Sequence, residues 1–256
     1  MQTLYIYGLD KIGLVKPGDD VAGLILQAMR EEHLTFKDGD VVVLSQKVVS
    51  KANGLLVDTL STKPTAKAKS LATKTGKIPG LVQLILQDSS QVLRADSQAF
   101  VVRRKDGLIC LNAGVDKSNV RGRWIYSRLP PDSDKAANEI RRKLEKRSRR
   151  KLAVIIADTF SRPMRVGQEE FAIGVAGMEP IVDYRGLRDL FGYHLRFKYV
   201  PLADEVAAAA ELVMGQGTEG TPVAIVRGLQ RVRESNKQHL SQSLLLHQKR
   251  DLFRGL

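Results

Sequence analysis

The sequence predicts an α+β protein in which mixed sheets are flanked by helices. Short apolar runs typical of buried strands, such as residues 41–44 and 152–156, occur among amphipathic segments without the regular strand–helix alternation of a parallel α/β sheet. The chain has 256 residues, 43% of them hydrophobic, which is enough to bury a sizeable core. No repeat or low-complexity linker marks a boundary, so we expect residues 1–256 to form one unit whose sub-domains the sequence leaves unresolved.

Strands and helices follow one another irregularly in the N-terminal half. Apolar residues at 21, 24, 25, 28 and 29 share one helical face behind Asp19 or Asp20, which predicts a helix from there. Residues 62–75 also form a helical pattern, with Gly76 as a typical helix end. Lys105-Asp106-Gly107 indicates a hairpin turn. The expected strands cover 4–7, 41–44, 100–104 and 108–111, and a short helix covers 79–87.

The C-terminal half contains the strongest helical patterns. Residues 134–150 place Ala136, Ala137, Ile140 and Leu144 on one face, and the alanine-rich segment 203–214 has high helix propensity. Strands are expected at 152–156, 196–202 and 223–226. The tail, residues 228–256, has leucines at 240 and 244–246 amid polar residues, so we expect a helix that packs against the body or a partner chain.

The chain is strongly basic, with 41 Lys and Arg against 28 Asp and Glu and a formal net charge of +13. This charge favours polyanionic partners, namely nucleic acid, nucleotides, phosphorylated cofactors or acidic surfaces, without choosing among them. The basic run 141–151 is either a polyanion contact or, as the favoured reading, a solvated helix face. No apolar stretch is long enough to span a membrane, and no secretory signal is recognised.

Cysteine and histidine chemistry is sparse. The single cysteine, Cys110, lies in an apolar run and is expected to be a packed thiol, and the lack of a disulfide partner fits a cytoplasmic protein. The four histidines are scattered, which argues against a zinc cluster. The P-loop, dinucleotide-binding and HExxH motifs are all missing.

Residues 151–177 are the centre of the functional prediction. The apolar run 152–156 breaks at Ala157-Asp158-Thr159, which predicts a carboxylate and a hydroxyl at a strand end, where ligands collect in open sheets. Asp158 is then either a ligand for a hard cation or a cap of a turn or helix. Asp116 likewise follows a predicted strand, so the two acids together suggest a divalent-metal site. The glycine-rich residues 214–221 either wrap a phosphate or only end a helix.

Seven segments occur in the order found in one enzyme family and span residues 8–229. They are KPGDD from Lys16, QKVVSKANG from Gln46, NAGVDKSNV from Asn112, ADTFSRPMRVGQEEFAIGVAG from Ala157, DYRGLRD from Asp183, ADEVAAAAELVMGQG from Ala203 and PVAIVRGL from Pro222. Together they resemble the coenzyme F420-0:L-glutamate ligase family. The basic tail, 229–256, is poorly matched apart from DLFR at 251–254.

The resemblance implies an activity and a set of ligands. The family joins L-glutamate to the lactyl carboxylate of coenzyme F420-0 with GTP, through an acyl phosphate, and members can add further gamma-linked glutamates. It implies Mg2+ or Mn2+, expected as two ions, with K+ as a further cation. It also implies an α+β family fold, an intertwined homodimer and a stand-alone enzyme without a fused partner domain.

The resemblance also assigns roles to residues. Metal ligands fall on Asp116, Asp158, Thr159 and Gln216, of which Asp116 and Asp158 serve catalysis. Nucleotide contacts fall on Lys51 and Asn119, with Gln46 and Lys47 beside them. Two loops complete the nucleotide site: Ile12, Gly13, Leu14 and Val15, and then Met214, Gly215, Gln216, Gly217, Thr218, Glu219, Gly220 and Thr221. Arg162, Arg165 and Arg185 are either phosphate clamps or members of structural ion pairs.

Three other readings remain. The same ligase chemistry could serve a different phosphorylated carboxylate or amino acid. A basic nucleic-acid-binding protein would use the 141–151 face, but it leaves Asp116 and Asp158 without a role. A degenerate family member that acts as an interaction subunit is disfavoured, because every proposed metal position keeps an oxygen-bearing side chain.

Overall fold

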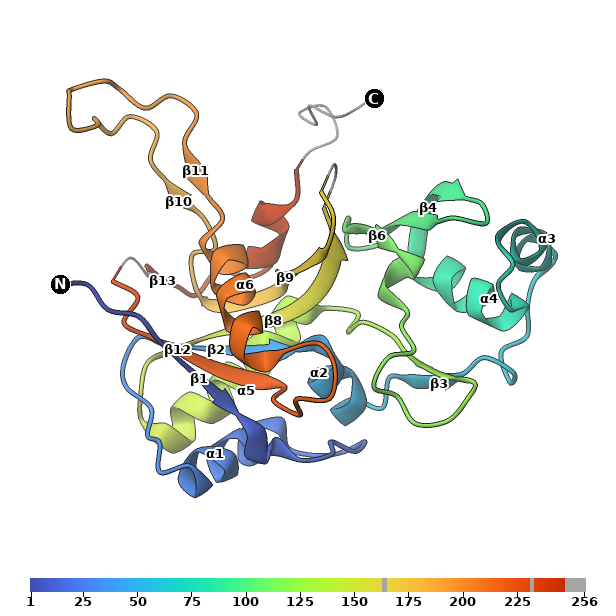
Figure 1. Cartoon of the computed structure of the whole chain (residues 1–256), viewed down its shortest axis with the longest axis horizontal. Coiled ribbons are helices and arrows are strands. Elements are labelled where there is room, and N and C mark those ends of the chain that lie inside the picture. Colours follow the sequence, from blue (N-terminus) through green and yellow to red (C-terminus); the bar gives the residue numbers. More distant parts are fainter. Residues whose placement is uncertain (163–164, 231–232, 247–256) are drawn as a thin grey trace. The chain divides into compact units, whose positions relative to one another are not determined.

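The structure is a computed structural model that describes residues 1–162, 165–230 and 233–246 (Figure 1). The chain forms two compact units. Unit 1 comprises residues 1–13, 22–45 and the chain from Ser133 onward, and unit 2 comprises residues 14–21 and 46–132. In the described residues no helix is long and apolar enough to cross a membrane.

Unit 1 is built on a mixed six-stranded sheet. Its order is β1 (Tyr5–Leu9), β12 (Val223–Arg227), β2 (Asp40–Ser45), β8 (Leu152–Ser161), β9 (Gln168–Met178) and β13 (Glu234–Ser235). Strands β2 and β8 are parallel, and the other neighbours are antiparallel. The prediction of mixed sheets with flanking helices is therefore confirmed.

Helices cover both faces of this sheet. Figure 1 shows α6 (Leu202–Met214) on one face and α1 (Val21–Glu31) and α5 (Ser133–Ser148) on the other. Val43 and Ile155 belong to the core beneath α6, and the alternate residues Leu44 and Ile156 are equally buried. Burial on both faces explains why these strands are continuous apolar runs in the sequence.

Unit 2 has its own core and two small sheets. Strand β3 (Leu56–Asp58) pairs with β7 (Ile125–Ser127), and β4 (Ser89–Ala95), β5 (Phe100–Arg104) and β6 (Ile109–Leu111) form an antiparallel sheet. The helices are α2 (Gln46–Ala52), α3 (Ala66–Thr75) and α4 (Pro79–Asp88). Buried residues of α3, α4 and β5 make one hydrophobic cluster, which includes Ala68, Ile85 and Phe100.

Several predicted elements differ from the structure. The helix expected over 62–75 begins at Ala66, because the Thr65 hydroxyl accepts the Ala68 amide and caps it there. The strand expected over 196–202 is only β11 (Tyr199–Val200). In the described part of the tail, β13 and a 3-10 helix, η3 (Leu240–Leu244), are found in place of the expected helix, while DLFR at 251–254 lies outside the described residues. Strands β3 and β7 were missed because each has only three residues, and β4 was missed because it carries no clear apolar period.

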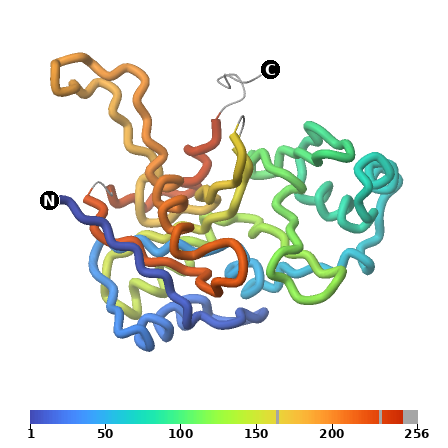
Figure 2. Tube along the Cα trace, viewed as in Figure 1, coloured from blue at the N-terminus to red at the C-terminus, as the bar shows by residue number. Residues whose placement is uncertain are grey.

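Residues 182–200 form a projecting arm. Strands β10 (Val182–Asp183) and β11 pair at its base, and Figure 2 shows the loop between them reaching away from the sheet of unit 1. Leu190, Phe191 and Phe197 on this arm are 98%, 96% and 88% exposed. Such large apolar side chains in one exposed segment are unusual on a monomeric surface.

Candidate functional site

Asp158 lies within β8 and not at its end. Strand β8 continues to Ser161 because residues 157–161 pair with β9, where Asp158 is opposite Phe171 and Thr159 is opposite Glu170. The register shifts between Ile156 and Ala157, at the point where the apolar run stops. The expectation that the strand ends before Asp158 is therefore wrong, and so is the reading of Asp158 as a cap.

Thr159 and Gln216, two predicted metal ligands, lie together in unit 1. Thr159 Oγ1 is 3.0 Å from Gln216 Oε1 and 3.3 Å from Glu170 Oε1. Gln216 Nε2 donates to Glu170 Oε1 at 3.1 Å and to Glu211 Oε1 at 2.8 Å. The sequence interpretation did not single out Glu170 or Glu211.

Carboxylates from α6 also bind the backbone of β9. Glu211 accepts the Glu170 amide at 3.1 Å, and Asp204 accepts the Ala172 amide at 3.0 Å. Burial raises the pKa of Asp204 to about 6 against the lowering effect of the Ala172 hydrogen bond, with a smaller contribution from the charge of Glu169. These contacts fix β9 beside the Thr159–Gln216 pair.

The glycine-rich segment 214–221 ends α6 and carries Gln216. Met214 is buried, and Gly215 has a positive φ of 67°, which terminates the helix. The Gly217 amide donates to Glu219 Oε2 at 2.7 Å. The helix-ending role of the loop is thus confirmed, and its contact with a phosphate stays a prediction.

Asp116 organises a second cluster, within unit 2. It forms an ion pair with Lys47, and Ser118 Oγ donates to it at 2.6 Å. The backbone amides of Lys117 and Ser118 donate to Asp116 Oδ1 at 2.6 and 3.1 Å. Burial raises the pKa of Asp116, but the hydrogen bonds from Lys47 and Ser118 outweigh it, so the pKa is below its ordinary value.

The lysines predicted near the nucleotide belong to α2. The side chain of Lys47 is only 16% exposed, so it is not a freely solvated surface lysine. Burial lowers the pKa of Lys51, and the charge of Lys47 adds to this shift. Gln46 is buried and accepts a hydrogen bond from Ser50 through Oε1, while its Nε2 has no partner in the described part of the chain.

The other predicted nucleotide contacts are distributed over both units. Ile12 is buried and Gly13 has a φ of 69° in unit 1, whereas Leu14 and Val15 belong to unit 2. Asn119 is an exposed residue of unit 2 with a left-handed φ of 53°. Their contact with a nucleotide stays a prediction.

The Thr159–Gln216 pair fits a hard cation. With metal–oxygen distances near 2.1 Å, two neighbouring oxygens of an octahedral Mg2+ shell lie about 3.0 Å apart. The Thr159 Oγ1 to Gln216 Oε1 separation is 3.0 Å, while Asp158, as the preceding residue of the same strand, points to the other face of β8. No group of three or more acidic, His or Cys side chains suited to a metal occurs in the described residues. Asp116 belongs to unit 2, so its convergence with Asp158 on shared cations stays a prediction.

The predicted arginine roles resolve mostly into ion pairs. Arg162 pairs with Glu169 at 2.7 Å, and Arg185 pairs with Asp183 at 2.6 Å. On α5, Arg142, Arg147 and most other basic residues are exposed, as a solvated face requires. Arg141 is the exception, because its side chain is only 14% exposed.

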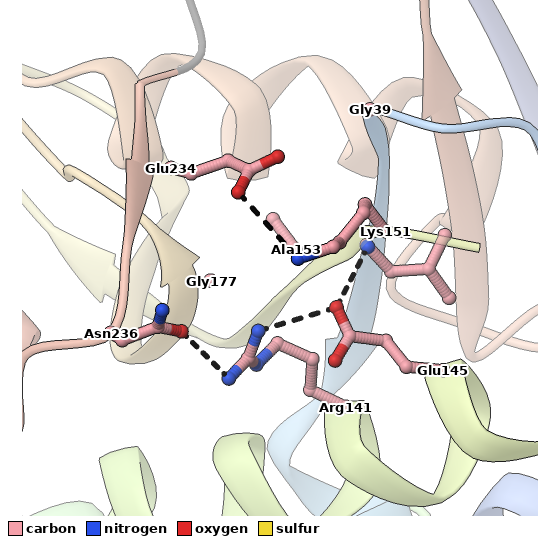
Figure 3. A pocket seen from close by; sticks show the side chains of 9 residues that line it. Gly39, Arg141, Glu145, Lys151, Ala153, Gly177, Glu234 and Asn236 are labelled. Carbon is pink, nitrogen blue, oxygen red and sulfur yellow. Dashed lines mark hydrogen bonds and ion pairs between the residues drawn. The ribbon is translucent and has the colours of Figure 1, made fainter. Parts of the chain in front are cut away.

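Arg141 lines a small cavity of about 30 Å³ at the start of β8 (Figure 3). It donates to Glu145 and Asn236, each at 3.2 Å, while Lys151 lies 3.9 Å from Glu234. Cations and carboxylates thus balance around a space that holds about one water molecule. The size and neutrality of this cavity make it unsuited to a nucleotide.

Comparison with known proteins identifies the family. The F420-0:gamma-glutamyl ligase family model matches residues 10–228. The chain is 44% identical over 223 residues to coenzyme F420:L-glutamate ligase of Methanothermobacter thermautotrophicus, covering 87% of this chain and 88% of the relative. It is 39% identical over 241 residues to the enzyme of that name from Methanopyrus kandleri, covering 94% and 93% of the two chains. The chain belongs to the F420-0:gamma-glutamyl ligase family.

Proposed function

We propose that this protein is a GTP-dependent ligase that forms an amide bond between L-glutamate and the lactyl carboxylate of coenzyme F420-0. The observation that carries the proposal is the family match over residues 10–228. The names of the relatives support both substrates. The pairing of Thr159 and Gln216 oxygens in unit 1 supports a divalent cation, which phosphoryl transfer from GTP requires.

The proposed reaction has two steps. The lactyl carboxylate attacks the terminal phosphorus of GTP, which forms an acyl phosphate and releases GDP. The amine of L-glutamate, as the free base, then attacks the acyl carbon, inorganic phosphate leaves, and one proton is released as the amide forms. Repetition on the side-chain carboxylate of the added residue would give gamma-linked glutamates.

The chain's own residues would bind and align the reactants. Asp116, Asp158, Thr159 and Gln216 would hold Mg2+ or Mn2+, which when bound neutralises the phosphate charge. Lys47 and Lys51 on α2 would face the phosphates. The low exposure of Lys47 would strengthen its electrostatic attraction to the phosphate groups. Positioning and charge neutralisation supply most of the catalysis in phosphoryl transfer.

We also propose a homodimer formed through the arm, residues 182–200. Leu190, Phe191 and Phe197 expose nearly all of their surface on this arm. Burying such side chains against a second copy would remove a large apolar area from water. This arrangement would account for the intertwined dimer that the family resemblance implies.

The activity is tested with purified protein, GTP, Mn2+, L-glutamate and coenzyme F420-0. We expect release of GDP and an F420 product heavier by one glutamyl residue, detected by mass spectrometry. Omission of GTP or of the divalent cation should stop the reaction. Replacing F420-0 or L-glutamate with related carboxylates and amino acids would separate this function from the same chemistry on other substrates. If no combination of nucleotide and divalent metal leads to extension of F420-0, the proposal is refuted.

A further inference from the structure

We infer that Glu170 is a positioning residue that takes the hydrogen bond of the Thr159 hydroxyl when a cation occupies the site. The inference rests on the proposed function, because it assigns Thr159 Oγ1 and Gln216 Oε1 to a divalent cation. Glu170 is 5% exposed and lies directly opposite Thr159 on the neighbouring strand. Neither the family resemblance nor the names of the relatives assign it a role.

The orientation of the Gln216 amide is fixed by two carboxylates. Its Nε2 group has two protons, and these go to Glu170 Oε1 at 3.1 Å and Glu211 Oε1 at 2.8 Å. A flipped amide would place its oxygen against both carboxylates and lose both hydrogen bonds. Glu170 and Glu211 therefore hold Gln216 with Oε1 toward Thr159.

The Thr159 hydroxyl has one proton and two acceptors within reach. Gln216 Oε1 is the nearer at 3.0 Å, and Glu170 Oε1 lies at 3.3 Å. A cation that binds both Thr159 Oγ1 and Gln216 Oε1 repels a proton placed between them. The proton must then turn toward Glu170. A hydrogen bond to the Glu170 carboxylate increases the negative charge on the hydroxyl oxygen, which makes this oxygen a better electron-pair donor to the cation.

Glu211 stabilises this arrangement through the backbone. Its second oxygen accepts the Glu170 amide at 3.1 Å, so a single carboxylate on α6 ties the β9 backbone to the Gln216 side chain. The two glutamates thus orient the predicted ligands, in the way that outer partners orient metal-bound side chains in other proteins. They are positioning residues and need not touch the cation.

A double-mutant cycle on the full chain tests the inference. Mn2+ affinity is measured by electron paramagnetic resonance of free Mn2+ for wild type, Glu170→Gln, Thr159→Val and the double variant. Outer-partner substitutions weaken metal binding by about tenfold or more, so we expect that loss for Glu170→Gln. In the Thr159→Val background the same change should have little effect, because the hydroxyl through which Glu170 acts is gone.

Matched variants separate this role from general charge effects. Glu169→Gln removes the neighbouring carboxylate, which pairs with Arg162, and should leave Mn2+ affinity near wild type. Thr159→Ser keeps the hydroxyl and should retain the dependence on Glu170. If Glu170→Gln fails to fold, Glu211→Gln serves instead. The two carboxylate oxygens of Glu211 accept the Glu170 amide and Gln216 Nε2, and the substitution replaces one of these oxygens with an NH2 group.

The outcomes distinguish the inference from the proposed function. Wild-type affinity in Glu170→Gln, or equal losses in both Thr159 backgrounds, overturns the positioning role and leaves the ligase proposal intact. A wild-type chain that binds no Mn2+ overturns both. A loss that disappears in Thr159→Val supports the inference.

Discussion

Asp204 on α6 accepts a hydrogen bond from the backbone amide of Ala172 on β9 at 3.0 Å. Glu211 does the same for Glu170, and Asp134 on α5 accepts the amide of Val175 at 2.6 Å. Strand β13 pairs with β9 only at Gly177 and Met178. Helix carboxylates therefore satisfy outward-facing amides of β9, which removes an edge to which another strand could add.

The Asp204 carboxylate should make stability depend on pH. Its folded pKa, about 6, is above its ordinary value of 3.8, so the folded state binds more protons than the unfolded state between these values. The protonated Asp204 carboxyl therefore stabilises the folded state at low pH, and this contribution is lost as pH rises through about 6. Asp204→Asn keeps an oxygen for Ala172 and removes the charge. We expect a melting temperature higher than wild type by roughly a few degrees at pH 7.5, and no gain at pH 4.

Thermal unfolding followed by circular dichroism between pH 4 and 8 measures this difference. Glu205→Gln, an exposed substitution one residue along the helix, is the control and should change the melting temperature little at either pH. A gain for Asp204→Asn that is the same at both pH values would contradict the assignment.

Asp158→Asn should abolish ligation and leave the fold intact. Asp158 is half-buried in β8, and the amide keeps its shape while removing one negative charge from the proposed cation site. We expect activity below about one hundredth of wild type, on the order of the loss typical for groups that stabilise transferred charge. The melting temperature should be unchanged. Asp10→Asn, an exposed change in the same unit, is the matched control, and retained activity in Asp158→Asn would show that the site lies elsewhere.

Asp116→Asn should destabilise unit 2 as well as reduce activity. The substitution removes the charge that pairs with Lys47 and weakens the hydrogen bonds from Ser118 and the Lys117 amide. Hydrogen bonds to charged groups contribute about 2 kcal/mol each, so we expect a loss of stability of that order at pH 7. Urea unfolding measures it, and Lys67→Gln, an exposed charge change in the same unit, is the control. Equal stability of Asp116→Asn and wild type would mean that Asp116 has no structural role.

The sequence predicted the sheet core well because burial on both faces leaves a readable signal. Residues 41–44 and 223–226 are apolar without interruption, and each is found within a central strand. The end of β8 could not be predicted, because residues 158–161, three of them polar, are held in the strand by pairing with β9. A pattern in one segment contains no information about its partner strand.

The candidate site depends on tertiary contacts that composition does not encode. Thr159 and Gln216 are 57 residues apart and meet through the fold of unit 1, so only the family resemblance brought them together beforehand. Glu170 was missed because no strand was predicted over residues 168–178, and acidic side chains are usually exposed. Arg141 was placed on the solvated face of α5, yet its stem packs where Gly177 has no side chain. Its guanidinium is satisfied by Glu145 and Asn236.

The arm, residues 182–200, should hold two copies together. Leu190→Asp places a charge on a side chain that is 98% exposed in the single chain, so it should leave the fold and melting temperature of the protomer unaltered. In a dimer formed through the arm, the same charge would be buried without a partner, which costs several kcal/mol. We therefore expect a monomer for Leu190→Asp and a dimer for wild type in light scattering coupled to size-exclusion chromatography.

Leu212→Asp, at an 85% exposed apolar position on α6, is the control and should remain dimeric. A Leu190→Asp protein with the same mass as wild type would exclude the arm as the contact.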